Sequence, residues 1–401
     1  MKILTLNCGS SSVKYSVVEM PSASKLCHGI IDRVLSQISS VEYFRKGNKY
    51  AHQRKCGNHT SAIEIISDLI SDKQVGVLSG YSELSAIGHR VVHGGEKFNK
   101  STFIDDAVIR IIEDYSDLAP LHNPANLAGI NAAMKLMPGV TNVAIFDTAF
   151  LATLSPHVYS YGLPYEWYEK YRIRKYGFHG SSHYYIAKRA AEILGRKQQE
   201  VNLITLHIGN GVSVTAVKRG KAYDHSMGFT PLEGAIMGTR CGDIDATIPL
   251  YVMRKENLNC QDMENILNKK SGLLGITGKY SDRRDILAAM SNGDEKAQLA
   301  FNMECYRLKK YIGAYIAALG RVDAIVFSGG VGERSFLHRL KICENLEYLG
   351  IKISENKNSD AIDGLKESII SDGDSTISIL VIPTDEEIVF AQEAYFLCQG
   401  Q

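Results

Sequence analysis

The chain has 401 residues, of which 45% are hydrophobic and 22% are charged, so it can bury a large core and is not expected to be disordered. Its net charge of +1 excludes the basic excess that is typical of proteins built around nucleic acid. The eight cysteines are scattered, form no C-x-x-C and are expected to be reduced thiols of a cytosolic protein. We see no signal peptide and no apolar run of about eighteen residues, so no membrane span is expected.

The first element predicted is a β-hairpin, made of the apolar stretches Ile3–Leu6 and Val13–Val18. Its turn carries the polar side chains Asn7, Ser10, Ser12 and Lys14. Phosphate is the first ligand to consider, because such a turn offers many hydrogen-bond donors. The usual phosphate loop, G-x-x-x-x-G-K-[ST], is absent, and a strand follows the turn instead of a helix.

A second stretch repeats this pattern 200 residues later. Residues 4–18 (LTLNCGSSSVKYSVV) and 204–218 (ITLHIGNGVSVTAVK) align without a gap, with four identities that include Thr5/Thr205 and Gly9/Gly209. Hairpins resemble one another by chance, and that remains an alternative for one pair. The length of the chain is sufficient for about two to three domains. We therefore interpret the repeat as two similar domains that face each other across a cleft.

The remaining pattern is α/β. Buried strands are predicted at Val143–Phe146, Ala324–Phe327 and Ile377–Ile382, and Leu35–Lys55 is polar and irregular, as in an exposed hairpin. Helices are predicted at Ala107–Leu118, Pro124–Met137, His183–Leu194, Lys296–Leu319 and Glu386–Leu397, with Asn123 as the cap of the second. The last helix is expected to return to the first domain.

Several polar side chains lie where strands are predicted to end. Arg90 follows one such strand and Asp147 another, and a buried carboxylate there is either a Mg²⁺ ligand or a helix cap. His179 and His183 have the i,i+4 spacing of a zinc pair, but the glycine and serines between them favour a helix start and no H-E-x-x-H is present.

Two further Gly-rich segments complete the inventory. Arg240 lies in MGFTPLEGAIMGTRCGDID (227–245), and a strand runs into glycines at VFSGGVGER (326–334). Two arginines, a histidine, donor-rich hairpins and carboxylates at separate strand ends suit phosphoryl transfer, which needs positive charge, Mg²⁺ and in-line positioning.

In these segments the sequence resembles the acetate/propionate/butyrate kinase family, through LNCGSSSVKYS, GHRVVHGGEKF, LAPLHNPAN, DTAF, YGFHGSSH, HIGNGVS, SMGFTPLEGAIMGTRCGDID, SGLLGITG, FSGGVGER and VIPTDEE. The resemblance implies the duplicated α/β fold of actin, Hsp70 and the sugar kinases (ribonuclease H-like domains), with an interdomain cleft. It implies an acid- and phosphate-side domain, 1–150 joined by the helix 386–401, and a nucleotide-binding domain, 151–385.

The resemblance also implies a reaction: reversible, direct in-line transfer of the ATP γ-phosphoryl group to acetate, giving acetyl phosphate and ADP, with Mg²⁺ (or Mn²⁺) and in a homodimer. Propionate or butyrate as acceptor is the nearest alternative, because one methylene is worth only about 1–3 kcal/mol of discrimination. A non-enzymatic, nucleotide-driven clamp of the same fold is a less favoured alternative. It would not need Arg90, His179 and Arg240 together.

Individual roles follow from the same resemblance. The catalytic residues are Asp147, His179 and Arg240, and the metal ligands are Asn7, Asp147 and Glu386. The acid is bound by Arg90 and by an apolar pocket of Val92, Leu121, Phe178 and Pro231. The nucleotide is bound by Ser10, Ser12, Lys14, His207, Ile208, Gly209, Asn210, Gly211, Asp282, Arg283, Arg284, Gly330, Val331, Gly332, Glu333 and Arg334.

Three positions depart from the family pattern. Leu151 replaces a frequent histidine, Arg283 a frequent aromatic residue and Arg334 a frequent asparagine. The last two lie where adenine is expected, which leaves the base preference open. The guanidinium plane of Arg283 still offers a surface on which a purine can stack.

Overall fold

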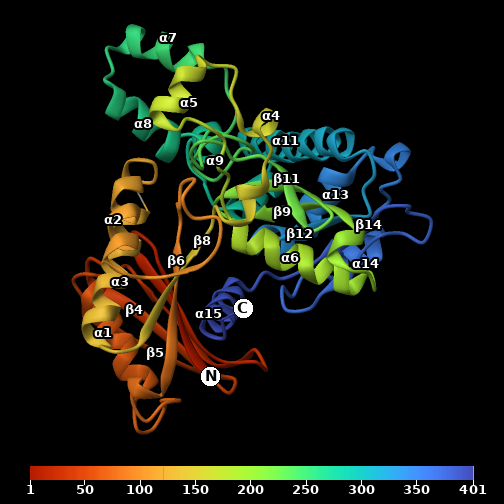
Figure 1. Cartoon of the computed structure of the whole chain (residues 1–401). Helices are drawn as coiled ribbons and strands as arrows, with labels where there is room; N and C mark the ends of the chain where they lie inside the picture. The colour runs from red at the N-terminus through yellow and green to blue at the C-terminus, as the bar shows by residue number, and fades with distance from the viewer. Residues whose placement is uncertain (121, 401) are drawn as a thin grey trace. The chain divides into compact units, whose positions relative to one another are not determined.

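The computed structural model describes residues 1–120 and 122–400, and its chain forms two compact units (Figure 1). Unit 1 comprises Met1–Ala152 and Asp385–Gln401, and unit 2 comprises Thr153–Thr384. The last helix therefore belongs to unit 1. In the described part of the chain, no helix is long and apolar enough to cross a membrane.

Unit 1 is built on an eight-stranded sheet with the order β5-β4-β3-β2-β1-β6-β8-β7. The strands β1, β6 and β8 are parallel neighbours at its centre. The bounds are β1 (Lys2–Cys8), β2 (Ser12–Glu19), β3 (Ser24–Asp32), β4 (Ser36–Arg45), β5 (Asn48–Cys56), β6 (Leu84–Val91), β7 (Thr102–Phe103) and β8 (Thr141–Phe146). The stretch expected to be an exposed hairpin is β4–β5, although β4 also buries Val41 and Tyr43.

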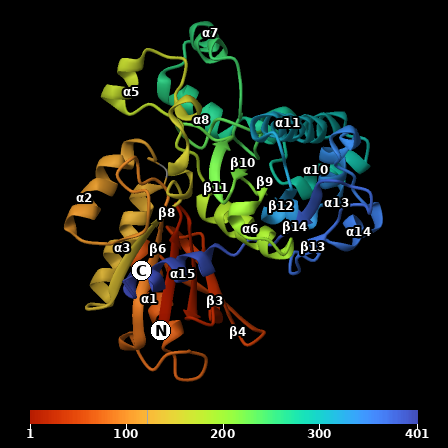
Figure 2. The same ribbon diagram turned by 45° about the vertical axis from the view of Figure 1, so that its right-hand side comes forward.

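Helices cover both faces of this sheet (Figures 1 and 2). Those on one face are α1 (His59–Ile70), α2 (Asp106–Asp114) and α3 (Asn123–Leu136), and α15 (Glu386–Cys398) lies on the other. Side chains alternate between faces along a strand. Leu4 and Leu6 accordingly pack towards α1 and α3, whereas Ile3 packs with Phe390 of α15.

Unit 2 repeats the arrangement around a six-stranded sheet with the order β11-β10-β9-β12-β14-β13. Its strands are β9 (Asn202–Ile208), β10 (Val212–Lys218), β11 (Lys221–His225), β12 (Ala324–Ser328), β13 (Ser368–Ile369) and β14 (Ser378–Val381). Its helices are α4 (Pro156–Tyr159), α5 (Tyr165–Tyr171), α6 (Gly180–Ile193), α7 (Thr247–Glu256), α8 (Cys260–Lys269), α9 (Gly272–Thr277), α10 (Arg283–Ser291), α11 (Glu295–Leu319), α12 (Gly329–Arg334), α13 (Phe336–Cys343) and α14 (Glu355–Asp360).

The two hairpins of the sequence repeat are β1–β2 and β9–β10, both antiparallel as predicted. The gapless alignment holds on the first strand only. Asn7 pairs with Lys14, whereas its counterpart His207 pairs with Ser213, because the second turn is one residue shorter. The structural equivalent of Lys14 is therefore Ser213, not Val214, since a turn can lose one residue while the strands on both sides keep their pairing.

All five predicted helices are present, with ends that shift by a few residues. One cap was predicted wrongly: Asn123 is the first residue of α3, and its buried side chain binds the backbone of His93 instead of capping. Tertiary hydrogen bonds there compete with the local cap. Leu121, expected in the acid pocket, lies outside the described residues.

Candidate active site

Three polar side chains of unit 1 meet at the carboxyl ends of its central parallel strands. Asn7 is the last residue but one of β1, Arg90 is the last but one of β6, and Asp147 directly follows β8. Their alternation places all three on the α15 face. Arg90 donates from Nε and Nη2 to Oδ2 of Asp147, at 3.0 and 2.5 Å, and from Nη1 to Oδ1 of Asn7 at 3.2 Å.

The charges of this cluster influence one another strongly. Burial alone would lower the pKa of the Arg90 guanidinium, but the carboxylates of Asp147 and Glu386 raise it above its usual range. Burial also raises the pKa of Glu386, and the positive charges of Arg90 and Lys14 oppose this rise. Glu386 is the first residue of α15, so the helix brings a second carboxylate to the end of the sheet. The side chain of Asp147 is 1% exposed.

Asn126, which the sequence reasoning missed, joins the ends of two strands in this region. Its side-chain amide accepts from the backbone N–H of Val92 at 3.0 Å and donates to the backbone carbonyl of Cys8 at 2.7 Å. It is buried and comes from α3. The segment LHNPAN was noted without a role for this residue, and no local pattern distinguishes a strand clamp from a surface asparagine.

In unit 2, four histidines gather between α6 and the sheet. The rings of His179 and His207 lie 4.5 Å apart, and His183 lies 5.4 Å from His225. His179 precedes α6 with a backbone φ of 58°, a left-handed conformation that a non-glycine residue adopts at some cost and that is frequent at functional sites. The helix therefore begins here, as expected, and does not present the pair as a zinc motif.

His183 has both ring nitrogens engaged. Nδ1 lies 2.8 Å from Oγ1 of Thr205, and Nε2 lies 2.8 Å from Oγ of Ser213. Burial, with His225 and His207 nearby, lowers its pKa well below the usual value. A buried neutral ring with two hydroxyl partners is not placed to bind zinc.

Arg240 lies beside His179 at the turn between β9 and β10. A Cβ added to Gly211 would approach Nη2 of Arg240 to 3.0 Å and Cε1 of His179 to 3.2 Å, so the absence of a side chain leaves room for both. Arg240 donates from Nη1 to the backbone carbonyl of Pro231 at 2.8 Å. Phe178 is buried, and its N–H donates to Nε2 of His225.

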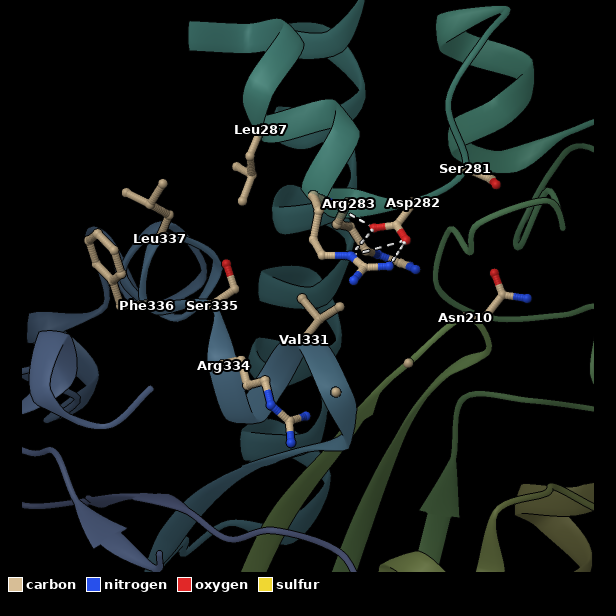
Figure 3. A pocket seen from close by; sticks show the side chains of 13 residues that line it. Asn210, Ser281, Asp282, Arg283, Leu287, Val331, Arg334, Ser335, Phe336 and Leu337 are labelled. Atoms are coloured by element: carbon tan, nitrogen blue, oxygen red, sulfur yellow. Dashed lines mark hydrogen bonds and ion pairs between the residues drawn. The ribbon is translucent and has the colours of Figure 1, made fainter. Parts of the chain in front are cut away.

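A cavity of about 690 Å³ is lined in part by Gly209 and Asn210 of the same turn (Figure 3). This volume lies within the range of small-molecule sites. The residues predicted to bind nucleotide that line it are Gly209, Asn210, Asp282, Arg283, Arg284, Gly330, Val331 and Arg334. The structure adds Ser281, Leu287, Ser335, Phe336 and Leu337, which no motif had indicated.

The remaining nucleotide candidates lie outside the lining of this cavity. His207 binds Oγ of Ser182 through Nδ1, at 2.8 Å. Glu333 accepts from the backbone N–H of Thr384, and burial raises its pKa. Ile208 and Gly332 are both buried. Ser10, Ser12 and Lys14 belong to unit 1.

Arg283 lines the cavity, but its guanidinium is paired with a buried carboxylate of the protein. Its guanidinium donates from Nη2 and Nε to Oε1 of Glu304, at 2.6 and 3.1 Å, and its side chain is 6% exposed. His338 approaches the other oxygen of Glu304 at 3.4 Å. The physical reason is that a buried carboxylate on α11 needs a cation, and Arg283 is the one that faces it.

The donors of unit 1 suit magnesium, which prefers oxygen ligands and is commonly held by one or two carboxylates together with water and phosphate. Asn7, Asp147 and Glu386 provide an amide and two carboxylates. Among residues 1–120 and 122–400, no group of three or more His, Cys, Asp or Glu is placed to hold a metal.

Comparisons with known proteins agree with this picture. The model of the acetokinase family matches residues 2–392. The chain is 51% identical over 401 residues to an acetate kinase of Geobacter sulfurreducens, covering 100% of this chain and 95% of the relative. It is 52% identical over 394 residues to one of Thermotoga petrophila, covering 98% of each chain.

Solved structures are similar over nearly the whole chain. The acetate kinase of Porphyromonas gingivalis has a TM-score of 0.92 at 45% identity, with 99% of both chains covered. A propionate kinase of Francisella tularensis has a TM-score of 0.91 at 38% identity, with 98% of this chain and 99% of that chain covered. These likenesses confirm the expected duplicated α/β fold.

Proposed function

Because the chain belongs to the acetokinase family, we propose that it is a kinase that transfers the γ-phosphoryl group of ATP reversibly to acetate. The observation that carries the proposal is the cluster of unit 1, where an arginine meets a buried carboxylate and an amide at the ends of parallel strands. All the motifs of the candidate site lie within the matched residues 2–392.

Arg90 is the proposed anchor of the acid. A guanidinium has five N–H donors in a fixed fork, of which Asp147 and Asn7 take three here. The two that remain suffice for a carboxylate, and the bonds to Asp147 fix the plane of the fork in advance. Preorganised donors of this kind lose little entropy on binding.

Asn7, Asp147 and Glu386 are the proposed residues that hold Mg²⁺. When bound, the ion neutralises charge on the phosphate oxygens and helps to align the reacting groups. The burial of Asp147 supports this role, because a carboxylate in a poorly solvated place interacts strongly with a nearby charge.

His179 and Arg240 are the proposed groups that stabilise the charge of the transferring phosphoryl group. They flank the same glycine, Gly211, and Arg240 is largely buried, so that burial lowers the pKa of its guanidinium and an anion bound there would oppose this shift. Electrostatic groups of this kind are worth about 10²–10³ in rate each. No covalent intermediate with the protein is needed.

The cavity of Figure 3 is the proposed nucleotide site. Leu287, Val331, Phe336 and Leu337 provide an apolar wall from three helices, which suits a nucleobase. Arg334 lies on the rim with 54% of its side chain exposed. Its side chain can therefore reorient to contact a bound ligand more easily than that of Arg283. Phe336 supplies the aromatic surface that Arg283 does not.

Propionate or butyrate remains an alternative acceptor of the same reaction, and the likeness to a propionate kinase supports it. Val92 is the proposed limit on acid length, because a bulky residue there shortens the pocket. A nucleotide-driven clamp would also use the nucleotide cavity. It would not require the Arg90–Asp147 cluster, which the kinase reaction does require.

A hydroxylamine trap tests the proposal. Protein, ATP, Mg²⁺ and hydroxylamine are incubated with acetate, propionate or butyrate, and the acyl hydroxamate is measured. We expect most product with acetate. A larger yield with a longer acid would reassign the acceptor, and no product with any of the three acids would reject the kinase reaction.

A homodimer in the cytosol is proposed on the family resemblance. Unit 2 supports it with exposed apolar side chains on α5 and α7 and beside them, which a second copy would cover: Leu163, Tyr165, Trp167, Tyr171, Ile248, Leu250 and Tyr251. Sedimentation equilibrium of the full chain at micromolar concentration tests this, and a monomer would contradict it.

A further inference from the structure

A chain of hydrogen bonds runs from His179 into the sheet of unit 2. Nδ1 of His179 lies 2.8 Å from Oγ of Ser213, which also lies 2.8 Å from Nε2 of His183. Nδ1 of His183 lies 2.8 Å from Oγ1 of Thr205, and that hydroxyl donates to the backbone carbonyl of Thr215 at 3.4 Å. Nothing in the proposed reaction uses Ser213, His183 or Thr205 directly.

Burial restricts how protons can be arranged along this chain. Ser213, His183 and Thr205 are all 0% exposed, so water does not compete for their hydrogen bonds. His183 is neutral, because burial opposes its positive charge. A neutral imidazole has one donor and one acceptor, and a hydroxyl has one proton. When Ser213 also uses its single proton within this chain, the bonds all point in the same direction.

The backbone carbonyl of Thr215, 3.4 Å from Oγ1 of Thr205, favours one direction. In this direction Thr205 donates to that carbonyl and accepts from Nδ1–H of His183. Nε2 of His183 is then an acceptor, and Ser213 donates to it. The lone pairs of Ser213 in turn accept from Nδ1–H of His179. In the opposite direction, Thr205 would give its proton to Nδ1 of His183 and would lose its hydrogen bond to the carbonyl of Thr215.

We propose that Ser213 and His183 are positioning residues that fix the tautomer of His179, with a ring proton on Nδ1 and with Nε2 turned towards the phosphate-binding turn. A Cβ on Gly211 would lie 3.3 Å from this Nε2, next to the guanidinium of Arg240. His179 then donates from Nε2 only as the imidazolium, which carries a full charge to the phosphoryl group. This inference rests on the proposed contact of His179 with that group.

The groups around His179 allow this assignment. His207 stacks on it at 4.5 Å and binds Ser182 through Nδ1, while Arg240 shares its glycine. The ring of His183 is linked to the ring of His179 through Ser213, and the backbone N–H of His183 donates to the backbone carbonyl of His179 at 3.0 Å. The hydroxyl of Ser213 thus links the two imidazoles, so that the proton arrangement of His183 determines the tautomer of His179.

Nitrogen-15 NMR of the imidazoles tests the tautomer without any turnover. The chain has 12 histidines, and the signals of His179 are identified by their loss in His179→Gln. We expect the Nδ1–H form of His179 in the unmodified protein at a pH where the ring is neutral. The Nε2–H form as the main species would overturn the proposal, whatever the activity of the protein.

Kinetics of three variants provide the second test. Ser213→Ala should lower kcat about 10–100-fold with smaller changes in KM for ATP and acetate, as for other residues that orient a functional histidine. Ser213→Thr keeps the hydroxyl and should recover most of kcat. Ser16→Ala is the matched control, because Ser16 is a buried serine of the equivalent hairpin whose hydroxyl lies 2.8 Å from that of Thr5.

The outcomes separate this inference from the proposed function. An unmodified protein without kinase activity would reject the function, and the NMR result would still decide the tautomer. An unchanged kcat in folded Ser213→Ala, or an equal loss in Ser16→Ala, would overturn the positioning role. If Ser213→Ala does not fold, Ser213→Thr and the NMR of the unmodified protein remain decisive.

Discussion

Arg283 and Glu304 form a buried ion pair in unit 2, between α10 and α11. Glu304 is 0% exposed and Arg283 6%, and the two residues share bonds of 2.6 and 3.1 Å. Removing one member of a buried pair leaves an uncompensated charge, which lowers the free energy of unfolding by about 3–5 kcal/mol. Glu304→Leu should therefore lower the melting temperature by about 6–20 °C at roughly 2–4 °C per kcal/mol for a unit of this size.

Apolar replacement of both partners should reverse most of this loss. Buried ion pairs that are replaced by apolar residues of similar volume are often neutral or stabilising. Arg283→Met with Glu304→Leu is thus expected to melt close to the unmodified protein. Arg284→Met is the control, because the neighbouring Arg284–Asp282 pair has exposures of 89% and 41% and should contribute little.

Tryptophan fluorescence is the assay, since the only tryptophan, Trp167, lies in unit 2 and reports on its unfolding. Acid adds a second readout. Burial alone would raise the pKa of Glu304, but Arg283 and His338 lower it to about 2, below its usual 4.5. The stabilisation is therefore present above pH 4.5 and is lost as the pH falls towards 2. Equal melting temperatures for Glu304→Leu and Arg284→Met would refute the reasoning.

Four substitutions test individual roles. Arg90→Leu should raise KM for the acid far more than KM for ATP, since the carboxylate loses its fork; an unchanged acid KM would remove Arg90 from the acid site. Asp147→Asn should lower kcat by at least ~10²-fold with little rescue by extra Mg²⁺, and near-normal turnover would leave Asp147 as a partner of Arg90 only. Lys14→Ala should weaken binding of a non-hydrolysable ATP analogue roughly tenfold but leave ADP nearly unaffected, as calorimetry can show; equal effects on both ligands would contradict a contact with the γ-phosphate. Phe336→Ala should raise KM for ATP but not for acetate, whereas Tyr348→Ala, an exposed aromatic residue outside the cavity, should change neither.

The sequence predicted what depends on neighbouring residues. Hairpins, buried strands and the start of α6 follow from alternation, turn residues and glycines, which act over a few positions. The strand ends that carry Asn7 and Asp147 were therefore found. The family resemblance supplied the residues of the proposed nucleotide site, many of which line one cavity.

Only the tertiary structure decided how distant polar groups satisfy one another. The family resemblance implies that Arg283 contacts the nucleotide, and only the structure shows that α11 brings a buried carboxylate to it from 21 residues away. Asn126 and Ser213 carry no local signal, because their roles lie in joining Cys8 to Val92 and His179 to His183. The physical reason is desolvation: a polar group that folding buries must find a partner in space, and its sequence neighbours do not reveal which partner that is.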